Sequence, residues 1–196
     1  MALLTAASRE VEEWKPVPAI LTFIAADMAA FALFFAFFMI GRHEQPALFD
    51  RSAALLNADV GAINTLILVT SSWLVVLAVQ AARQAHQRAV KRFLALAFTV
   101  GAGFAVTKAM EWGDKLSHGI TLLSNDFFMF YYVLTGIHFL HFVIGMAVLA
   151  MLWFKAGQET VDGPLLGWLE SGGLYWHMVD LLWIVLFPML YLLGRR

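Results

Sequence analysis

Long apolar runs alternate with short polar linkers along this sequence. Five runs are long enough to cross about 30 Å of hydrocarbon, which takes about 20 residues of helix. They span residues 19–40, 60–82, 93–113, 126–154 and 168–193. The linkers hold the turn-forming residues and most of the charge. This pattern predicts an all-α polytopic membrane protein. Its five transmembrane helices form one domain at 19–194, after an N-terminal tail at 1–18.

The fourth apolar run carries a polar stripe. Thr135, His138 and His141 follow one another at steps of three residues, and Gly145 lies four residues further on. Steps of three and four return to nearly the same side of a helix. We therefore expect the stripe to face other protein segments while the rest of the helix meets lipid.

Ionisable residues within the runs should face protein, water or a partner. A charge at the bilayer centre costs at least about 2.5 to 3.5 kcal/mol. Asp27 lies about 12 Å into the first run by helix rise, either hydrated near the helix start or buried and able to exchange a proton. Lys108 and Glu111, three residues apart, can form a structural ion pair. A small proton-coupled transporter built around these residues is one alternative, although no inverted repeat is visible.

Two further runs carry polar residues with regular spacing. In the second run, Asn64 and Ser71 are seven residues apart on one helix face, which favours packing between helices. In the fifth run, Glu170 and His177 are also seven apart, and Asp180 follows three residues later. The tryptophans of the fifth run, Trp176 and Trp183, are expected to face lipid or the membrane interface.

These side chains allow two interpretations. The HxxH pair, His138 and His141, with Glu170 and His177 has the residue types of a metal or haem site in a membrane enzyme. However, di-metal helix bundles use Glu-x-x-His on two helices, and His138 and His177 differ in depth by about 11 Å. The other interpretation is a polar network that joins the helices and meets lipid or a neighbouring subunit. The residues assigned to this network are Asn64, Ser71, Lys108, Glu111, Thr135, His138, His141, Glu170, His177 and Asp180.

Composition and charge exclude several kinds of partner and cofactor. The 196 residues are 61% hydrophobic and 14% charged, with a mean hydropathy of +0.76. A formal net charge of -1 provides no basic surplus for a nucleic-acid partner. The lack of cysteine excludes disulfides, thiolate-held zinc, iron–sulfur clusters and covalently attached c-type haem.

The distribution of Lys and Arg predicts the orientation. Seven of them lie in the N-terminal tail and in the second and fourth linkers, against five on the opposite face. The surplus comes from the cluster between Arg83 and Arg92. Because cytoplasmic loops are enriched in Lys and Arg, we expect a cytoplasmic N-terminus and a periplasmic C-terminus, with Trp14 and Lys15 at the membrane surface.

Four stretches resemble the signature motifs of the haem-copper oxidase subunit III family, in the same order and in successive membrane segments. They read INTLILVTSSW, TKAMEW, FMFYYVLTGIHFLHFVIG and YWHMVDLLWIVLF, and the resemblance covers about residues 19–194. In the family, the position of Asp27 holds a membrane-buried carboxylate, usually Glu, that reacts with carbodiimides. Glu111 with Trp112 stands where the family usually has Glu-Tyr. The residues that fit their places in the motifs are His138, His141, His177 and Asp180.

The resemblance implies an accessory subunit with no metal or cofactor of its own. Its partner would be a catalytic subunit carrying haem with copper or non-haem iron, and it would bind phospholipid and support proton uptake and sustained turnover. Better-known family members have seven helices. A five-helix form resembles variants of the bacterial inner membrane, including the subunit III-like proteins that accompany nitric oxide reductase, to which the run FFMFYYVLTGIHFLH looks closest. The partner's substrate, oxygen or nitric oxide, stays open at this point.

Overall fold

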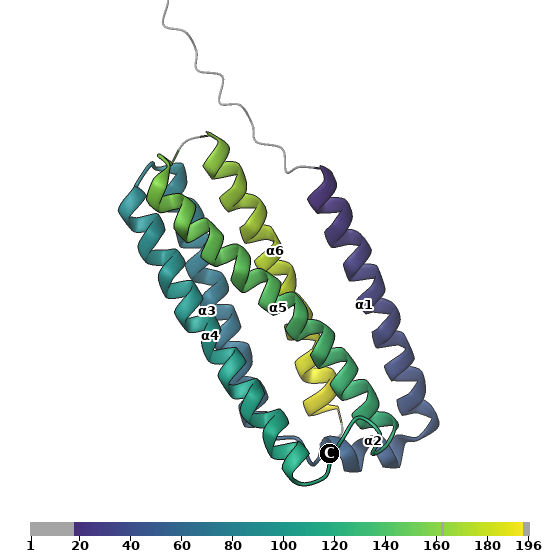
Figure 1. Cartoon of the computed structure of the whole chain (residues 1–196). Coiled ribbons are helices and arrows are strands. Elements are labelled where there is room, and N and C mark those ends of the chain that lie inside the picture. The colour runs from purple at the N-terminus through teal and green to yellow at the C-terminus, as the bar shows by residue number, and fades with distance from the viewer. Residues whose placement is uncertain (1–17, 162, 194–196) are drawn as a thin grey trace, which may run out of the picture.

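The computed structural model describes residues 18–161 and 163–193, whose regular structure is helical throughout. Its long helices run side by side in an elongated bundle, and the short helix α2 lies across one end (Figure 1). They are α1 (Pro18–Glu44), α2 (Pro46–Ala53), α3 (Ala58–Arg83), α4 (Gln87–Ser117), α5 (Asp126–Gln158), α6 (Gly163–Phe187) and the short π-helix η1 (Pro188–Leu192).

Within these described residues, α1, α3, α4, α5 and α6 with η1 are the five helices long and apolar enough to span a membrane. This confirms the predicted all-α polytopic architecture. The helices extend past the apolar runs; α4, for example, begins at Gln87 and ends at Ser117, where the run covers 93–113. The reason is that apolar residues mark only the part of a helix in hydrocarbon, whereas the backbone stays helical into the headgroup region. The predicted tail, with Trp14 and Lys15, lies outside the described residues except for Pro18.

Local signals explain where two of these helices begin. The side-chain oxygen of Asn57 accepts a hydrogen bond from the backbone N–H of Asp59 at 3.0 Å, and that of Asn125 accepts one from Phe128 at 3.0 Å. Both satisfy backbone donors that the first helical turn leaves free. The short helix α2 occupies a segment expected to be a linker. Its Phe49 is buried and packs edge-on against Phe38, with ring centroids 5.3 Å apart.

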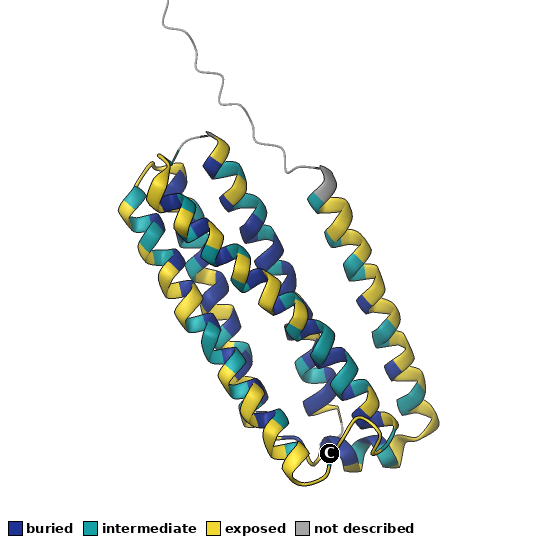
Figure 2. Cartoon of the chain, viewed as in Figure 1, coloured by how far each residue is buried: buried dark blue, intermediate teal, exposed yellow. Residues whose placement is uncertain are grey.

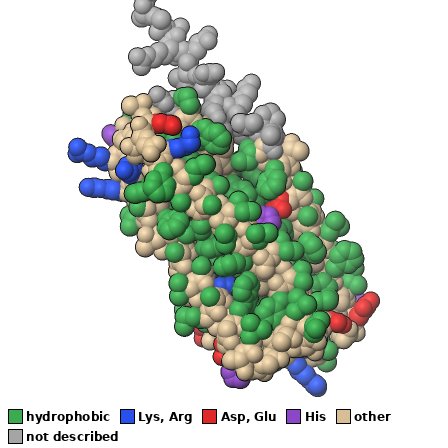
Figure 3. Space-filling model, in the orientation of Figure 1, with side chains coloured by type: hydrophobic (Ala, Val, Ile, Leu, Met, Phe, Trp, Pro, Cys, Tyr) green, Lys and Arg blue, Asp and Glu red, His purple; other side chains and the backbone are tan. Residues whose placement is uncertain are grey.

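The bundle is tight on one side and loose on the other. Helices α3 and α4 form the most extensive pair, and α6 packs against both α3 and α5. Helix α1 packs chiefly against α2, α5 and α6, and most of its surface is exposed (Figure 2). On the face seen in Figure 3, hydrophobic side chains predominate in the middle, where a red side chain beside a purple one and a small blue patch are also visible, and most charged side chains lie towards the two ends. This is the distribution expected for a protein surrounded by lipid.

The prediction that Trp176 and Trp183 face lipid is wrong, because both are buried, with 1% and 0% of their surface exposed. Trp176 lies over Gly145; a Cβ at that position would come within 2.7 Å of its ring. Trp183 donates its indole N–H to Thr65 Oγ1 at 3.2 Å and meets Phe104 edge-on. The missing side chain of Gly145 thus leaves space for the Trp176 ring, and the Thr65 hydroxyl satisfies the indole N–H of Trp183 in the core.

Candidate functional site

A closed ring of polar contacts lies in the interior between α4, α5 and η1. The Lys108 ammonium donates to Glu111 Oε2 at 3.1 Å, to Tyr191 at 2.9 Å and to Tyr131 at 3.3 Å. Both phenols donate to the other carboxylate oxygen of Glu111, Tyr131 at 2.9 Å and Tyr191 at 2.6 Å. The predicted ion pair is therefore present, and two phenols complete it.

The ring is enclosed by aromatic side chains. Lys108 is fully buried, at 0% exposure, and its Nζ lies 5.1 Å from the ring centroid of Trp183. An ammonium over an aromatic face gains electrostatic stabilisation where water is excluded. All three Lys108 donors have acceptors and both Glu111 oxygens have donors, so the desolvation cost of this pair is offset locally. The arrangement joins three helical elements and leaves no Lys108 donor free for a ligand.

Asp27 and His141 form a second polar contact, between α1 and α5. His141 Nε2 lies 3.1 Å from Asp27 Oδ1, and the two side chains are 12% and 16% exposed. The other oxygen of Asp27 is buried and has no hydrogen-bond partner in the described part of the chain. This contact lies on a helix that otherwise packs loosely, so it is a main polar link between α1 and the bundle.

The geometry of His141 fixes the number of protons on this pair. His141 Nδ1 lies 2.8 Å from the carbonyl oxygen of Ile137, and a carbonyl can only accept, so Nδ1 carries a proton. The contact between Nε2 and Asp27 Oδ1 then needs a second proton, either on the imidazole or on the carboxyl. The pair thus holds one shared proton and is neutral overall in both forms. Proton exchange is the chemistry that this arrangement can perform.

His138 faces a different neighbour from His141. Its Nε2 lies 3.0 Å from the carbonyl oxygen of Val179 on α6 and therefore donates to it. Its Nδ1 is buried without a hydrogen-bond partner among residues 18–161 and 163–193. The centroid of the imidazole lies 5.5 Å from that of the Phe104 ring and 5.2 Å from that of the Trp183 ring. The stripe on α5 is thus divided, because His138 is directed to α6 and His141 to α1.

A third polar group joins α3 and α6. Ser72 Oγ lies 2.5 Å from His177 Nδ1, and Asp180 follows His177 three residues later on α6. Asp180 is 7% exposed, and its Oδ1 lacks a hydrogen-bond partner in the part of the chain that the structure describes. His177 and Asp180 were among the predicted network residues, whereas Ser72, which directly follows Ser71, was not.

The remaining residues assigned to the network lie apart from these groups. Ser71 donates to the carbonyl of Ala97 at 2.8 Å, and Asn64 accepts from Thr107, so both join α3 to α4. Thr135 donates to the Tyr131 carbonyl one turn earlier on α5, at 2.6 Å. Glu170 pairs with Arg83 at 2.8 Å where the side chain of Arg83 is 63% exposed. The single predicted network is thus several separate contacts, each between two or three elements.

The metal-site interpretation requires His138 and His177 to point to a common position. His138 is directed to a backbone carbonyl and His177 to Ser72, so the two imidazoles do not converge. Across the described residues, no three His, Asp or Glu side chains come close enough together to hold a metal ion. Tyr131 and Tyr191 were not among the predicted site residues. Their hydroxyl groups donate hydrogen bonds to Glu111. Tyr131 lies one helical turn before Thr135 and so on the same side of α5, and this spacing is the sequence feature that could have indicated it.

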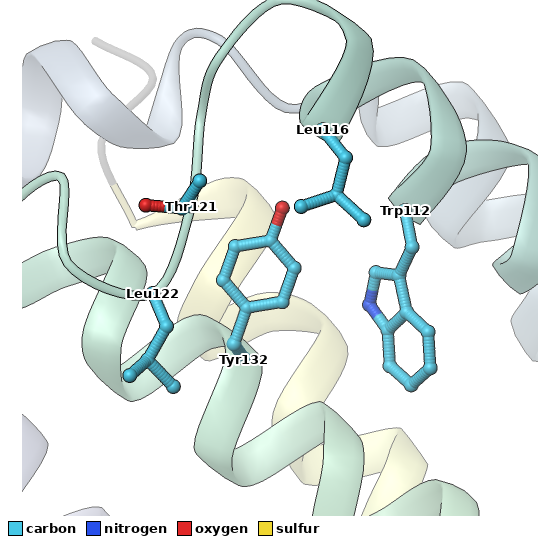
Figure 4. A pocket seen from close by; sticks show the side chains of 5 residues that line it. All are labelled: Trp112, Leu116, Thr121, Leu122 and Tyr132. Carbon is cyan, nitrogen blue, oxygen red and sulfur yellow. The ribbon is translucent and has the colours of Figure 1, made fainter.

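A pocket of about 380 Å³ opens near the C-terminal end of α4. It is lined by Trp112, Leu116, Thr121, Leu122 and Tyr132. Figure 4 shows the Tyr132 ring at its centre, with the nitrogen edge of the Trp112 indole turned towards it. Tyr132 donates to the Ile120 carbonyl at 2.8 Å, whereas the indole N–H of Trp112 is buried with no acceptor in the described segments. The pocket is therefore lined mainly by apolar groups.

The helices and their contacts define the class of this molecule: a polytopic helical membrane protein whose described interior uses its ionisable side chains to join helices. The chain belongs to the cytochrome c oxidase subunit III family, whose model matches residues 17–195. This confirms the resemblance seen in the four motifs. The likeness to the proteins that accompany nitric oxide reductase stays a prediction.

Several relatives share most of the chain. It is 30% identical over 179 residues to "Cytochrome c oxidase subunit 3" of Thermostichus vulcanus, covering 90% of this chain and 86% of that protein. It is 26% identical over 171 residues to "Probable cytochrome c oxidase subunit 3" of Mycobacterium bovis, covering 87% and 84%. It is 29% identical over 194 residues to "Heme-copper oxidase subunit I+III" of Aeropyrum pernix, covering 93% of this chain and 24% of that longer protein.

Proposed function

We propose that this chain is a non-catalytic accessory subunit of a haem-copper superfamily respiratory complex in a bacterial inner membrane. The observation that carries the proposal is the match to subunit III across residues 17–195. The polar contacts support it, because Lys108, Glu111 and His138 form hydrogen bonds with residues of neighbouring helices. The haem, with copper or non-haem iron, belongs to the partner subunit, and electrons do not pass through this chain.

The partner of this subunit is the catalytic haem-copper subunit. The name of the Aeropyrum protein joins subunits I and III in one chain, which supports a direct contact between the two. The names of the relatives favour a partner that reduces oxygen. Nitric oxide reductase is the second candidate, favoured by the aromatic run that begins at Phe127. In both cases the N-terminus is cytoplasmic and the C-terminus periplasmic, as the Lys and Arg distribution predicts.

Within this complex the Asp27–His141 pair supports proton uptake. The pair lies on the loosely packed helix α1, and one oxygen of Asp27 has no partner among the described residues. A carboxyl with a free oxygen and a shared proton can pass that proton to a water molecule or to the neighbouring subunit. The pair is therefore proposed to support proton-coupled turnover without contacting the reacting oxygen or nitric oxide.

Bound phospholipid is the second part of the proposal. The pocket beside Tyr132 is apolar and holds about 380 Å³, which suits part of an acyl chain. The indole of Trp112 in its lining suits the depth of the ester groups, because Trp is favoured where hydrocarbon meets headgroups. A lipid at this position would fill the gap between the ends of α4 and α5.

Co-purification tests the accessory role. A tagged form of the full chain, extracted from native membranes in a mild detergent, is expected to bring down a haem-containing large subunit together with phospholipid. The optical spectrum and the metal content of the complex then identify an oxygen-reducing or a nitric-oxide-reducing partner. The proposal fails if the chain is recovered alone and stable from membranes that contain the large subunit.

The substitution Asp27→Asn tests the proton role. The amide that replaces the carboxyl can still exchange a hydrogen bond with His141, so we expect the assembled complex to form while proton-coupled turnover falls and its pH profile changes. His141→Gln should give the same change, because it removes the other half of the pair. Asp59→Asn, which changes an exposed acid in the first turn of α3, is the matched control. Unchanged turnover and an unchanged pH profile in both variants of the pair would show that it is only structural.

A further inference from the structure

A second pocket, of about 610 Å³, opens where α4 begins, at the other end of this helix from the first pocket. Its lining includes the basic residues His86, Arg88 and Arg92 and the apolar residues Phe93 and Leu96. In Figure 3, blue side chains project from the part of the bundle where α3 connects to α4. We call Arg88 and Arg92 the arginine pair. A cavity of this composition can accept an anion and hydrocarbon side by side.

The arginine pair differs from other basic residues at the same end of the bundle. Arg83 pairs with Glu170 at 2.8 Å, and Lys155 pairs with Glu159 at 3.5 Å. In contrast, neither member of the arginine pair forms a hydrogen bond, an ion pair or a ring contact within residues 18–161 and 163–193. The two guanidinium charges are therefore not neutralised by a side chain of the described structure.

The helix geometry turns the arginine pair away from α5. The side chain of Gln87 donates a hydrogen bond to the Glu159 carbonyl at 2.6 Å, and Lys91 Nζ lies 5.0 Å from the ring centroid of Trp153. These two residues thus occupy the side of α4 that packs on α5. The arginine pair and Leu96 recur at steps of four residues, so they form a separate stripe with about 6 Å of rise between successive members.

The depth of this stripe matches the boundary of the bilayer. The apolar run of α4 covers residues 93–113, so Arg92 directly precedes it and Arg88 lies about 6 Å further out. The headgroup layer is about 5 to 8 Å thick on each side of the hydrocarbon. Leu96, which is 50% exposed, lies within the run. The pocket therefore places two cations at the depth of lipid phosphates and apolar side chains at the depth of acyl chains.

We infer that this pocket binds a phospholipid whose headgroup carries a net negative charge. The arginine pair holds the phosphate, because a guanidinium matches phosphate oxygens with two parallel hydrogen bonds. The side chain of His86, at the N-cap, makes no capping hydrogen bond, and the positive end of the helix dipole adds to the attraction. Phe93 and Leu96 contact the upper part of an acyl chain.

The charge of the lining distinguishes anionic from zwitterionic lipid. The pocket is lined by cations and contains no acidic residue among those that line it. A zwitterionic headgroup would bring its own cation next to the arginine pair and find no carboxylate to receive it. An anionic headgroup brings only the phosphate charge that the pocket can neutralise. This site is additional to the lipid proposed beside Tyr132 and does not depend on the identity of the catalytic subunit.

Photo-labelling with two lipid probes tests the inference. The full chain is reconstituted in phosphatidylcholine vesicles that contain a trace of photoactivatable phosphatidylglycerol or, in parallel, of phosphatidylcholine with the same diazirine in its acyl chain. After irradiation, mass spectrometry of peptides locates the adducts. At low salt we expect phosphatidylglycerol to label residues 93–96 roughly ten-fold more than phosphatidylcholine, with a smaller excess at high salt.

Three variants define the role of the arginine pair. The double substitution Arg88→Gln with Arg92→Gln should remove the preference for phosphatidylglycerol. Arg88→Lys with Arg92→Lys should keep a reduced preference, because lysine retains the charge but lacks the planar fork. Arg83→Gln is the matched control: it removes a cation from the same end that is 63% exposed and already paired with Glu170, and the preference should stay the same. Far-ultraviolet circular dichroism checks that each variant keeps its helices.

Three results would overturn the inference. One is equal labelling of residues 93–96 by the two probes. Another is a preference for phosphatidylglycerol that survives the double glutamine substitution. The third is loss of labelling when millimolar inorganic phosphate replaces chloride at the same ionic strength, since the pocket would then be a site for a free anion. The accessory role is tested separately by co-purification and stands or falls without this site.

Discussion

Replacing Lys108 with methionine is expected to lower the free energy of unfolding by about 3 to 5 kcal/mol, the cost of removing one partner from a buried ion pair. The Glu111 carboxylate would keep its two phenol donors but lose its only cation within hydrogen-bond distance in the described structure. At the same time, Tyr131 and Tyr191 would lose the ammonium that donates to them. Unfolding in mixed detergent micelles, followed by tryptophan fluorescence, measures the loss.

Two variants serve as controls for the Lys108 substitution. Lys115→Met removes a cation near the C-terminal end of α4, where it pairs at 2.9 Å with Asp114, whose side chain is 54% exposed, and should cost about 1 kcal/mol. The double variant Lys108→Met with Glu111→Gln should recover much of the loss, because it leaves no unpaired charge. Equal effects of Lys108→Met and Lys115→Met would contradict the view that the ring is a buried, mutually satisfied unit.

Replacing Gly145 with alanine is expected to destabilise the protein by about 1 to 3 kcal/mol, the usual cost of overpacking a core. The added methyl would lie 2.7 Å from the Trp176 ring. That ring is 1% exposed and packs against Phe142, so it cannot move aside without disturbing the neighbouring side chains. The same micelle unfolding assay reports the loss, and near-ultraviolet circular dichroism should detect the displaced indole.

Gly136 offers a matched control on the same helix. A Cβ built at Gly136 meets nothing within 4 Å, so Gly136→Ala should leave stability unchanged or raise it slightly through its better helix propensity. Equal losses for the two substitutions would mean that glycine is needed for the conformation of α5. They would count against close packing with Trp176.

The residues of the fifth apolar run show how far the sequence could lead. The length and composition of each run predicted five spanning helices, because crossing hydrocarbon demands about 20 apolar residues in a helix whatever the neighbours are. The same run did not reveal that Trp176 and Trp183 are buried, since an apolar side chain gives the same sequence pattern whether it contacts lipid or protein. Only the position of Gly145 and Thr65 on other helices decides that.

The polar residues show the same division. Spacing on one helix was enough to predict the Lys108–Glu111 pair, because both partners lie within one turn. It could not show that Tyr131 and Tyr191, distant in sequence, would close a ring around them. Likewise, His138 and His141 share a stripe, yet they bond to α6 and α1. Their different partners follow from the packing of both α6 and α1 against α5.

The sequence by itself determined the class, the number of spanning helices and the family, because these depend on hydrophobic length and on short local motifs. The tertiary structure alone decided which buried groups pair, which remain unpartnered, and therefore where a proton or a neighbouring subunit can act. The physical reason is that in a membrane each polar side chain must find its partner on another helix. The identity of that partner depends on how whole helices pack.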